Sequence, residues 1–328
     1  MKCIETDKRR ETSCATSPSR LRNHLRMSKS PRLAKQNRVP MNRLAFLVGL
    51  ALAASTPSYA EKSNPNLLSR GNFANSLHRF EKEKKGHVAF MGGSITEMNG
   101  YRPILKDWLK KRFPKTEFTF TNAGISSTCS TTGAFRLERD ILNHGPVDLF
   151  FVEFAVNDDQ DAGHDRESCH RGVEGILRHL RTHNPRSDVV LTYFVNPGML
   201  KVLQGGKQPL PMAAHEEVLK HYDVSAVHLA KEVAERINAG TYSWAKFGGT
   251  HPKRPGNQLA ANLAGRLLEN GWKKAGSAKP LPHPPIFQIG VGGGRGCQHA
   301  GSIICGLLCG GPPTIHPSQH SSTSFWRK

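Results

Sequence analysis

The chain has 328 residues, of which 37% are hydrophobic and 22% charged, so it can form one large globular domain or two small ones. Its formal net charge of +20 raises the question of a nucleic-acid partner. The sequence contains no helix-turn-helix, zinc-finger or RNA-recognition pattern, and no basic and aromatic interleaving typical of a single-strand groove. We therefore expect a basic surface and no nucleic-acid partner.

The segment 41–60 has the three parts of a secretory signal peptide. A positive charge at Arg43 is followed by an apolar run over 44–54 and by a small-residue ending at Ala60. The apolar run is too short to span a membrane comfortably. We therefore expect cleavage after Ala60, a secreted or periplasmic protein, and no stable membrane span once the signal is removed.

A basic leader of 40 residues precedes this signal pattern. Residues 1–60 hold twelve Lys and Arg against three Asp and Glu. Because a signal peptide acts from the extreme N-terminus, we interpret residues 1–40 as untranslated, with the start at Met41, or as disordered. A dual leader or an uncleaved anchor is the alternative interpretation.

Short β-rich runs alternate with amphipathic stretches through the middle of the chain, which predicts a parallel sheet with helices on both faces. Continuous apolar runs indicate central strands that are buried on both faces. The domain over 61–275 is therefore predicted to be α/β, a three-layer αβα sandwich around a five-stranded parallel sheet. The expected strands are 87–91, 117–121, 147–154, 189–195 and 224–227, with helices near 101–113, 133–143, 170–183, 212–221, 229–239 and 256–270.

The segment 276–328 is rich in Gly, Pro, His and Ser and has no sustained periodicity, so we expect a disordered tail. Two of the seven cysteines, Cys129 and Cys169, lie in the predicted domain. They can form a disulfide in an oxidising compartment or remain two free thiols. No spacing of Cys and His suggests a zinc site.

Four short motifs follow predicted strands or precede the last predicted helix. They are Gly-Gly-Ser94-Ile-Thr, Asn-Ala-Gly124, Val-Asn157-Asp-Asp and Thr-His251-Pro. Because chemistry in such sheets gathers at the carboxyl ends of the strands, we expect these four motifs to meet. Taken singly, Ser94 could be a helix N-cap, Gly124 and Asn157 turn formers, and His251 a loop histidine.

Together the four motifs have the residue types that acyl transfer requires. Ser94, on a tight turn after a strand, would be the nucleophile, and His251 would be its general base. The backbone N–H of Gly124 and the side-chain amide of Asn157 could bind the developing oxyanion.

These motifs resemble the four blocks of the SGNH hydrolases, a branch of the GDSL esterases and lipases, over residues 86–270. The resemblance implies a flavodoxin-like fold and no metal or organic cofactor. It also implies an oxyanion hole made by the N–H groups of Ser94 and Gly124 and by the amide of Asn157.

The sequence departs from that family at two positions. Gly93 stands at the position of the Asp in the GDSL motif that names the family. Gly248 stands where an aspartate normally precedes the histidine by three residues. His251 could therefore bond a backbone carbonyl within 246–249 and act in a Ser–His dyad. Alternatively another acid orients it, the candidates being Asp158, Asp159 and Glu97, or hydrolysis has been lost.

Two charged segments are given no role in the chemistry. The run from Asp158 to Asp161 is interpreted as a solvated acidic loop, because no further oxygen ligands follow at suitable spacing. The segment from Arg136 to Asp140 is interpreted as the polar face of a helix with intrahelical ion pairs.

We therefore expect an exported serine ester hydrolase that acts on a small-molecule or carbohydrate ester, with the removal of small acyl groups from carbohydrate as one such activity. A polysaccharide O-acyltransferase is one alternative, and a non-catalytic carbohydrate-binding protein on a degenerate hydrolase scaffold is another. The sequence predicts neither the acyl length nor the oligomeric state.

Overall fold

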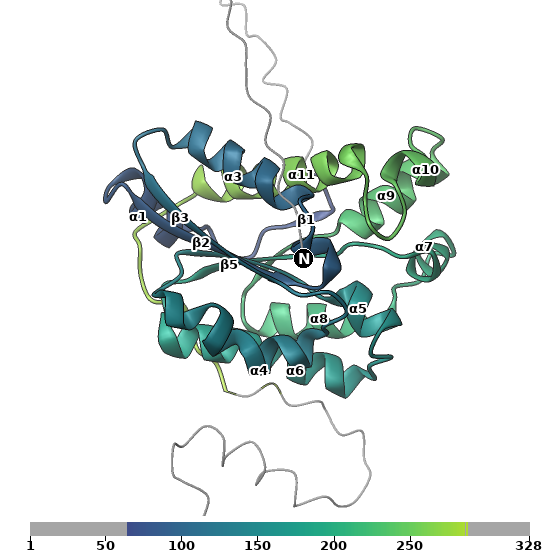
Figure 1. Cartoon of the computed structure of the whole chain (residues 1–328), viewed down its shortest axis with the longest axis horizontal. Coiled ribbons are helices and arrows are strands. Elements are labelled where there is room, and N and C mark those ends of the chain that lie inside the picture. Colours follow the sequence, from purple (N-terminus) through teal and green to yellow (C-terminus); the bar gives the residue numbers. More distant parts are fainter. Residues whose placement is uncertain (1–63, 286, 288–328) are drawn as a thin grey trace, which may run out of the picture. The chain divides into compact units, whose positions relative to one another are not determined.

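The computed structural model describes residues 64–285 and 287 (Figure 1). A six-stranded sheet lies between two layers of helices, so the predicted three-layer sandwich is confirmed. Five strands are parallel and follow the order β3, β2, β4, β5, β6 across the sheet. Their bounds are β2 Lys85–Gly92, β3 Glu117–Gly124, β4 Leu149–Glu153, β5 Asp188–Thr192 and β6 Ser225–Val227.

A sixth strand, β1 (Leu67–Leu68), corrects the prediction of five. It pairs antiparallel with β6, with Leu67 opposite Val227. Two residues are too short to show the alternation by which a strand is recognised in a sequence. Backbone hydrogen bonds hold this edge, including one of 2.8 Å from the N–H of His228 to the carbonyl of Asn66.

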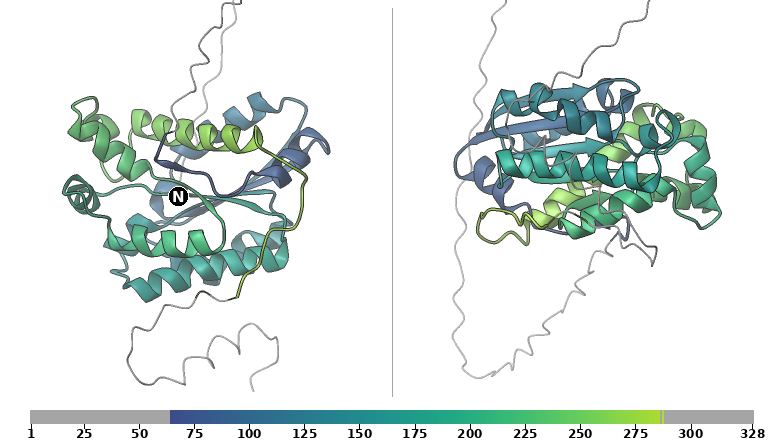
Figure 2. Two further views of the ribbon diagram at one scale, coloured as in Figure 1. Left: turned by 180° about the vertical axis from the view of Figure 1, so that it is seen from behind. Right: turned by 90° about the horizontal axis from the view of Figure 1, so that it is seen from below.

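Helices cover both faces of the sheet, as Figures 1 and 2 show, and all six predicted helices are present. One layer contains α1 (Ala74–Glu81), α3 (Tyr101–Arg112) and α11 (Arg254–Trp272), with α9 (Leu229–Asn238) beside α11. The other contains α4 (Ser130–Asp140), α6 (Arg166–His183) and α8 (Leu210–His221). The shorter helices are α2 (Ser94–Glu97), η1 (Leu142–His144), α5 (Ala155–Gln160), α7 (Pro197–Gln204) and α10 (Trp244–Phe247).

The central strands are buried on both faces, as their continuous apolar runs predict. Seven of the eight residues of β2 and all five of β4 are buried. Phe90 of β2 stacks on Phe151 of β4 with ring centroids 5.0 Å apart. Each such ring contributes about 1.5–3 kcal/mol on burial, so the sheet forms a rigid base for the loops at its carboxyl edge.

The beginning of the expected tail packs on the domain, so the ordered part of the chain continues past residue 276. The N–H of Leu281 donates to the carbonyl of Pro185 at 2.7 Å, and Arg181 donates to the carbonyl of Pro282 at 2.6 Å. These partners lie far from the tail in the sequence, so no local pattern reveals the contact. The leader, the signal segment and residues 288–328 lie outside the described residues.

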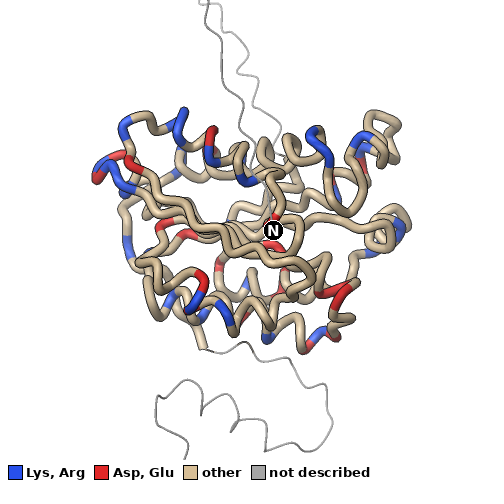
Figure 3. The backbone as a smooth tube through the Cα atoms, viewed as in Figure 1, with Lys and Arg blue, Asp and Glu red and all other residues tan. Residues whose placement is uncertain are grey.

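Figure 3 shows Lys and Arg on both helical layers with Asp and Glu between them. Cys129 and Cys169 are free thiols in this structure. Among the described helices, none combines the length and hydropathy that a membrane crossing requires.

Candidate active site

The predicted motifs lie at the point where the strand order reverses. β2 has β3 on one side and β4 on the other, and this switch point is where ligands bind in open α/β sheets. Ser94 begins α2 two positions after the end of β2, and Gly124 is the last residue of β3. Asn157 is the third residue of α5, four positions after the end of β4.

Ser94 and His251 are in direct contact. Ser94 Oγ lies 2.7 Å from His251 Nε2, although the two residues are 157 positions apart in the chain. His251 lies in the loop between α10 and α11 and is exposed, whereas Ser94 is half-buried. If Nδ1 carries the imidazole proton, Nε2 accepts the hydrogen bond from the serine hydroxyl, as a general base must.

None of the three candidate acids contacts His251. Each carboxylate binds another part of the chain instead. The partners are His215 Nε2 for Asp158 (2.8 Å), Asn196 Nδ2 for Asp159 (2.8 Å) and the backbone N–H of Ser126 for Glu97 (2.9 Å). Within the described residues, no side chain and no carbonyl of 246–249 hydrogen-bonds Nδ1 of His251, so the geometry is that of a Ser–His pair.

The backbone at Gly248 excludes the aspartate that the family usually has there. Gly248 has φ of +109°, and a Cβ at this position would lie 2.2 Å from the backbone nitrogen of Lys253. Gly249 also has positive φ (+94°), but a Cβ there would meet nothing within 4 Å. The loop before His251 is therefore built around the absence of a side chain at position 248.

Asn257, on the first turn of α11, holds the loop that carries His251. Its Nδ2 donates to the carbonyl of Pro252 at 2.6 Å and to that of Lys253 at 3.2 Å. Asn257 is 4% exposed. Because Pro252 follows His251 directly, these hydrogen bonds fix the backbone next to His251. The sequence has no signal for this role beyond an Asn early in a helix.

A buried carboxyl group hydrogen-bonds the turn that carries Ser94. Glu153, at the end of β4, accepts hydrogen bonds from the N–H of Gly93 (3.1 Å) and from the N–H and hydroxyl of Thr96 (3.2 and 2.8 Å). Burial is the main cause that raises the pKa of Glu153, to about 8, against the lowering effect of these hydrogen bonds. The apolar run of β4 conceals this residue in the sequence.

The interpretation of Arg136 as part of an exposed polar face is wrong. Arg136 is 6% exposed and donates to the carbonyl of Gly92 at 3.0 Å and to that of Ala123 at 2.7 Å. Arg136 also forms an ion pair with Asp140 at 2.9 Å, so the predicted intrahelical ion pair is present. The guanidinium thus joins the ends of β2 and β3, which carry two of the predicted oxyanion donors.

The predicted oxyanion donors have partners of their own. Gly124 N–H donates to Asn122 Oδ1 at 3.0 Å, and Asn157 Nδ2 donates to Asp161 Oδ2 at 2.6 Å. Asn157 Nδ2 has a second hydrogen that remains for a ligand. No acceptor in the described residues bonds the N–H of Ser94.

Gly93 lets Asn157 approach the nucleophile turn. A Cβ at position 93 would lie 2.2 Å from Asn157 Oδ1. The presence of Gly93 in place of the Asp of the GDSL motif therefore has a local packing reason.

The Ser94–His251 pair is accessible to solvent. The hydrogen bond between them is exposed. Two cavities of about 400 and 410 Å³ lie elsewhere, one beside β1, α7 and α9 and the other beside α1.

Comparison with known proteins identifies a matching family model and similar solved structures. The family model described as "GDSL-like Lipase/Acylhydrolase family" matches residues 90–259. Two crystal structures of a two-domain esterase (CEX) active on acetylated mannans are similar, one of them co-crystallized with mannopentaose. They have 25% and 26% sequence identity, TM-scores of 0.55 and 0.56, and 67% of this chain covered in each case.

The chain spans 59% and 60% of the length of those two structures. No curated protein matches the chain. The family model covers just over half of the 328 residues and includes all four predicted motifs. The chain therefore belongs to the GDSL-like lipase/acylhydrolase family.

Proposed function

We propose that the chain is an exported serine ester hydrolase that removes acetyl or other small acyl groups from carbohydrate. The observation that carries the proposal is the 2.7 Å hydrogen bond between Ser94 Oγ and His251 Nε2. A nucleophile and its base need this distance before proton transfer can accompany attack. It argues against the degenerate scaffold that only binds carbohydrate.

In the first half of the reaction, Ser94 Oγ attacks the ester carbonyl carbon while His251 Nε2 takes the hydroxyl proton. The N–H groups of Ser94 and Gly124 and the free hydrogen of the Asn157 amide bind the oxyanion. Gly124 N–H must turn from Asn122 to do so. The tetrahedral intermediate then collapses, and the bond between the carbonyl carbon and the sugar oxygen breaks as that oxygen takes the Nε2 proton. The sugar leaves as an alcohol, and an acyl-enzyme ester on Ser94 remains.

In the second half, His251 Nε2 removes a proton from water, which attacks the acyl-enzyme carbonyl. Collapse of the tetrahedral intermediate returns the proton to Ser94 Oγ and releases the carboxylic acid. Because His251 is exposed and its Nδ1 has no hydrogen-bond partner among the described residues, water would take the place of a carboxylate there. The oxyanion donors supply much of the remaining catalysis in such a dyad.

The carbohydrate part of the proposal has two supports. The similar solved structures belong to an esterase active on acetylated mannans. In addition, the exposed Ser94–His251 pair leaves room for a bulky alcohol, and a short acyl group needs no deep cavity. A long-chain lipid ester would instead require an apolar channel at the site.

The test is hydrolysis of p-nitrophenyl acetate, p-nitrophenyl butyrate and an acetylated mannan by the wild type and by Ser94→Ala, His251→Ala and Asn157→Ala. We expect each substitution to lower kcat by about a hundredfold or more. Ser69→Ala, at an exposed serine far from the site in sequence, is the control.

A fluorophosphonate probe separates the alternatives. A wild type that neither labels at Ser94 nor hydrolyses any of the three esters would refute the catalytic proposal. Labelling without hydrolysis, together with acyl transfer to added oligosaccharide, would identify the acyltransferase alternative. For the export part, the N-terminus of the mature protein should be Glu61.

A further inference from the structure

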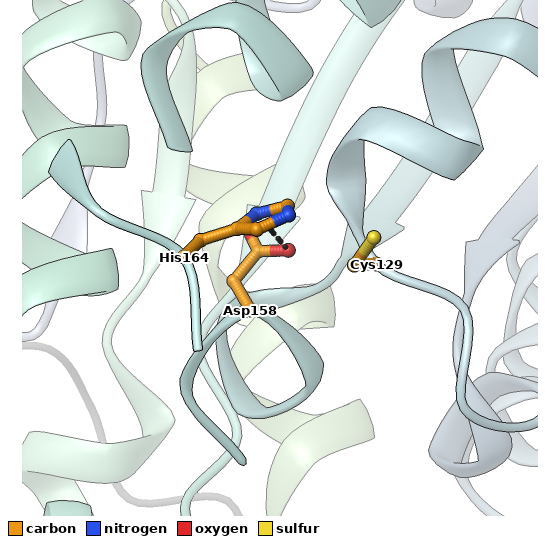
Figure 4. A group of neighbouring side chains, drawn as sticks. All are labelled: Cys129, Asp158 and His164. Atoms are coloured by element: carbon orange, nitrogen blue, oxygen red, sulfur yellow. Dashed lines mark ion pairs between the residues drawn. The ribbon is translucent and has the colours of Figure 1, made fainter. Parts of the chain in front are cut away.

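A second group of reactive side chains lies close to the proposed active site but takes no part in its chemistry. Cys129 is the residue before α4, Asp158 lies on α5, and His164 lies in the loop between α5 and α6 (Figure 4). One donor atom from each of these side chains lies within 4.8 Å of the other two. Sulfur, imidazole nitrogen and carboxylate oxygen are thus brought together from three segments.

The present contacts of these atoms leave donor capacity unused. His164 Nδ1 lies 3.3 Å from Asp158 Oδ1, but this buried nitrogen makes no hydrogen bond within the part of the chain that the structure describes. Cys129 Sγ lies 3.2 and 3.3 Å from the hydroxyl groups of Thr131 and Thr132, and the backbone N–H of Thr132 also donates to it. A buried imidazole nitrogen without a hydrogen bond is costly, so a ligand at this place would remove a penalty.

The charge of Asp158 is also incompletely balanced. Its side chain is fully buried, and its ion-pair partners among the described residues are two histidines, His164 and His215, with no Lys or Arg. The backbone N–H of Ser130 donates to its Oδ1 at 2.7 Å. A buried carboxylate with only neutral or weakly basic neighbours favours a cation.

We propose that Cys129, Asp158 and His164 bind a divalent cation of borderline softness, Zn²⁺ being the best match. A thiolate, an imidazole and a carboxylate are the donor types that Zn²⁺ takes in tetrahedral sites. The thiolate and the carboxylate together neutralise its charge. Cys129 and His164 are partly exposed, so water can occupy the fourth position and the ion has a route in.

The surroundings orient the carboxylate for this task. His215 Nε2 lies 2.8 Å from Asp158 Oδ2, on the oxygen that the cation would not need. Such outer hydrogen bonds fix metal-binding groups and raise affinity. A second set, Asp158, Cys169 and His215, also meets the distance limit, but all three residues are buried and give a hydrated ion no access.

The bound ion would connect the start of α4, helix α5 and the loop before α6. Asn157, a proposed oxyanion donor, is next to Asp158 on α5. The site would therefore stabilise the segment that carries this donor. Its metal binding is independent of whether the chain hydrolyses esters, and it is measured without any substrate.

The experiment uses the full chain, with the five cysteines outside the described residues replaced by serine in every sample: Cys3, Cys14, Cys297, Cys305 and Cys309. Zn²⁺ is titrated in competition with a chromophoric chelator, and Co²⁺ is added to a second sample for visible and near-ultraviolet spectroscopy. We expect one ion per chain and, with Co²⁺, tetrahedral absorption with a sulfur-to-metal charge-transfer band.

Two ligand variants and one matched control decide the assignment. Cys129→Ser and His164→Asn should each weaken Zn²⁺ binding by about tenfold or more, and Cys129→Ser should remove the charge-transfer band. Cys169→Ala, at the buried cysteine of the second set, should retain both. Circular dichroism checks that every variant is folded.

Zn²⁺ affinity that is unchanged by both Cys129→Ser and His164→Asn would overturn the proposal. So would loss of binding in Cys169→Ala with retention in Cys129→Ser. A wild type that takes up no Zn²⁺ under reducing conditions would also overturn it.

Discussion

The carboxyl group of Glu153 is predicted to make the stability of this protein fall as pH rises. Glu153 is completely buried beneath the nucleophile turn, and burial raises its pKa to about 8, while its ordinary value is 4.5. Oε1 accepts three hydrogen bonds, whereas Oε2 has no hydrogen-bond partner among the described residues. Glu153→Gln keeps the shape and the accepting oxygen but cannot ionise.

The sign follows from proton binding in the two states. Between pH 4.5 and 8 the folded protein keeps the Glu153 proton and the unfolded chain has lost it. The free energy of unfolding therefore falls by up to about 1.4 kcal/mol per pH unit. This contribution is fully present below the unfolded pKa and lost as pH approaches the folded value. Between pH 5 and 7.5 the loss amounts to about 3 kcal/mol.

Glu153→Gln should lack this slope. Its amide NH₂ replaces an equally unpaired hydroxyl, so the offset between the two proteins at pH 5 should be only about 1 kcal/mol. At pH 7.5 the variant should be the more stable protein by about 2 to 4 kcal/mol. Other buried acids, such as Asp188, are common to both proteins and cancel in the difference.

The assay is urea unfolding of both proteins at pH 5, 6, 7 and 7.5, followed by tryptophan fluorescence. The difference in unfolding free energy should change steadily with pH while the m-values stay equal. Parallel profiles would refute the reasoning, because they would mean that Glu153 titrates at the same pH in the folded and unfolded chain.

Three further changes test the supports of the site. Gly248→Ala should lower the melting temperature more than Gly249→Ala, because both backbones are left-handed but only the Cβ at 248 collides with the chain; equal shifts in calorimetry would contradict this. Arg136→Met should lower kcat by about tenfold to a hundredfold through misplaced oxyanion donors, while Arg139→Met, exposed on the same helix, should leave kcat unchanged within about twofold. Asn257→Ala should lower kcat by a similar factor with little change in KM, since it holds the base and not the substrate; a change confined to KM in steady-state kinetics would exclude that role.

The fold could be predicted because its signals are local. Buried parallel strands appear as continuous apolar runs, and β2 and β4 are of this kind. The two-residue strand β1 has no such signal, since it is defined by its pairing with β6. Similarly, the packing of Leu281 against Pro185 depends on a partner almost a hundred residues away.

The location of the candidate site could also be predicted from the sequence. Ser94 and Asn157 come shortly after strands and Gly124 ends one, and the carboxyl ends of parallel strands share one edge of the sheet. The sequence marked Gly248 as a departure but could not choose among the replacements for the missing aspartate. In the structure, all three candidate acids hydrogen-bond groups other than His251. Hydrogen-bond partners depend on side-chain direction and not on nearness in the chain.

The amino-acid sequence by itself therefore predicted the sheet, its helical layers and the edge at which Ser94 and His251 meet. Only the tertiary structure decided which polar groups are buried and what they contact. Glu153 is hidden in an apolar strand, Arg136 looks like a surface residue, and Cys129 and His164 have no metal-site spacing. Burial and long-range contacts give these residues their properties, because desolvation and hydrogen bonding act between groups that folding brings together.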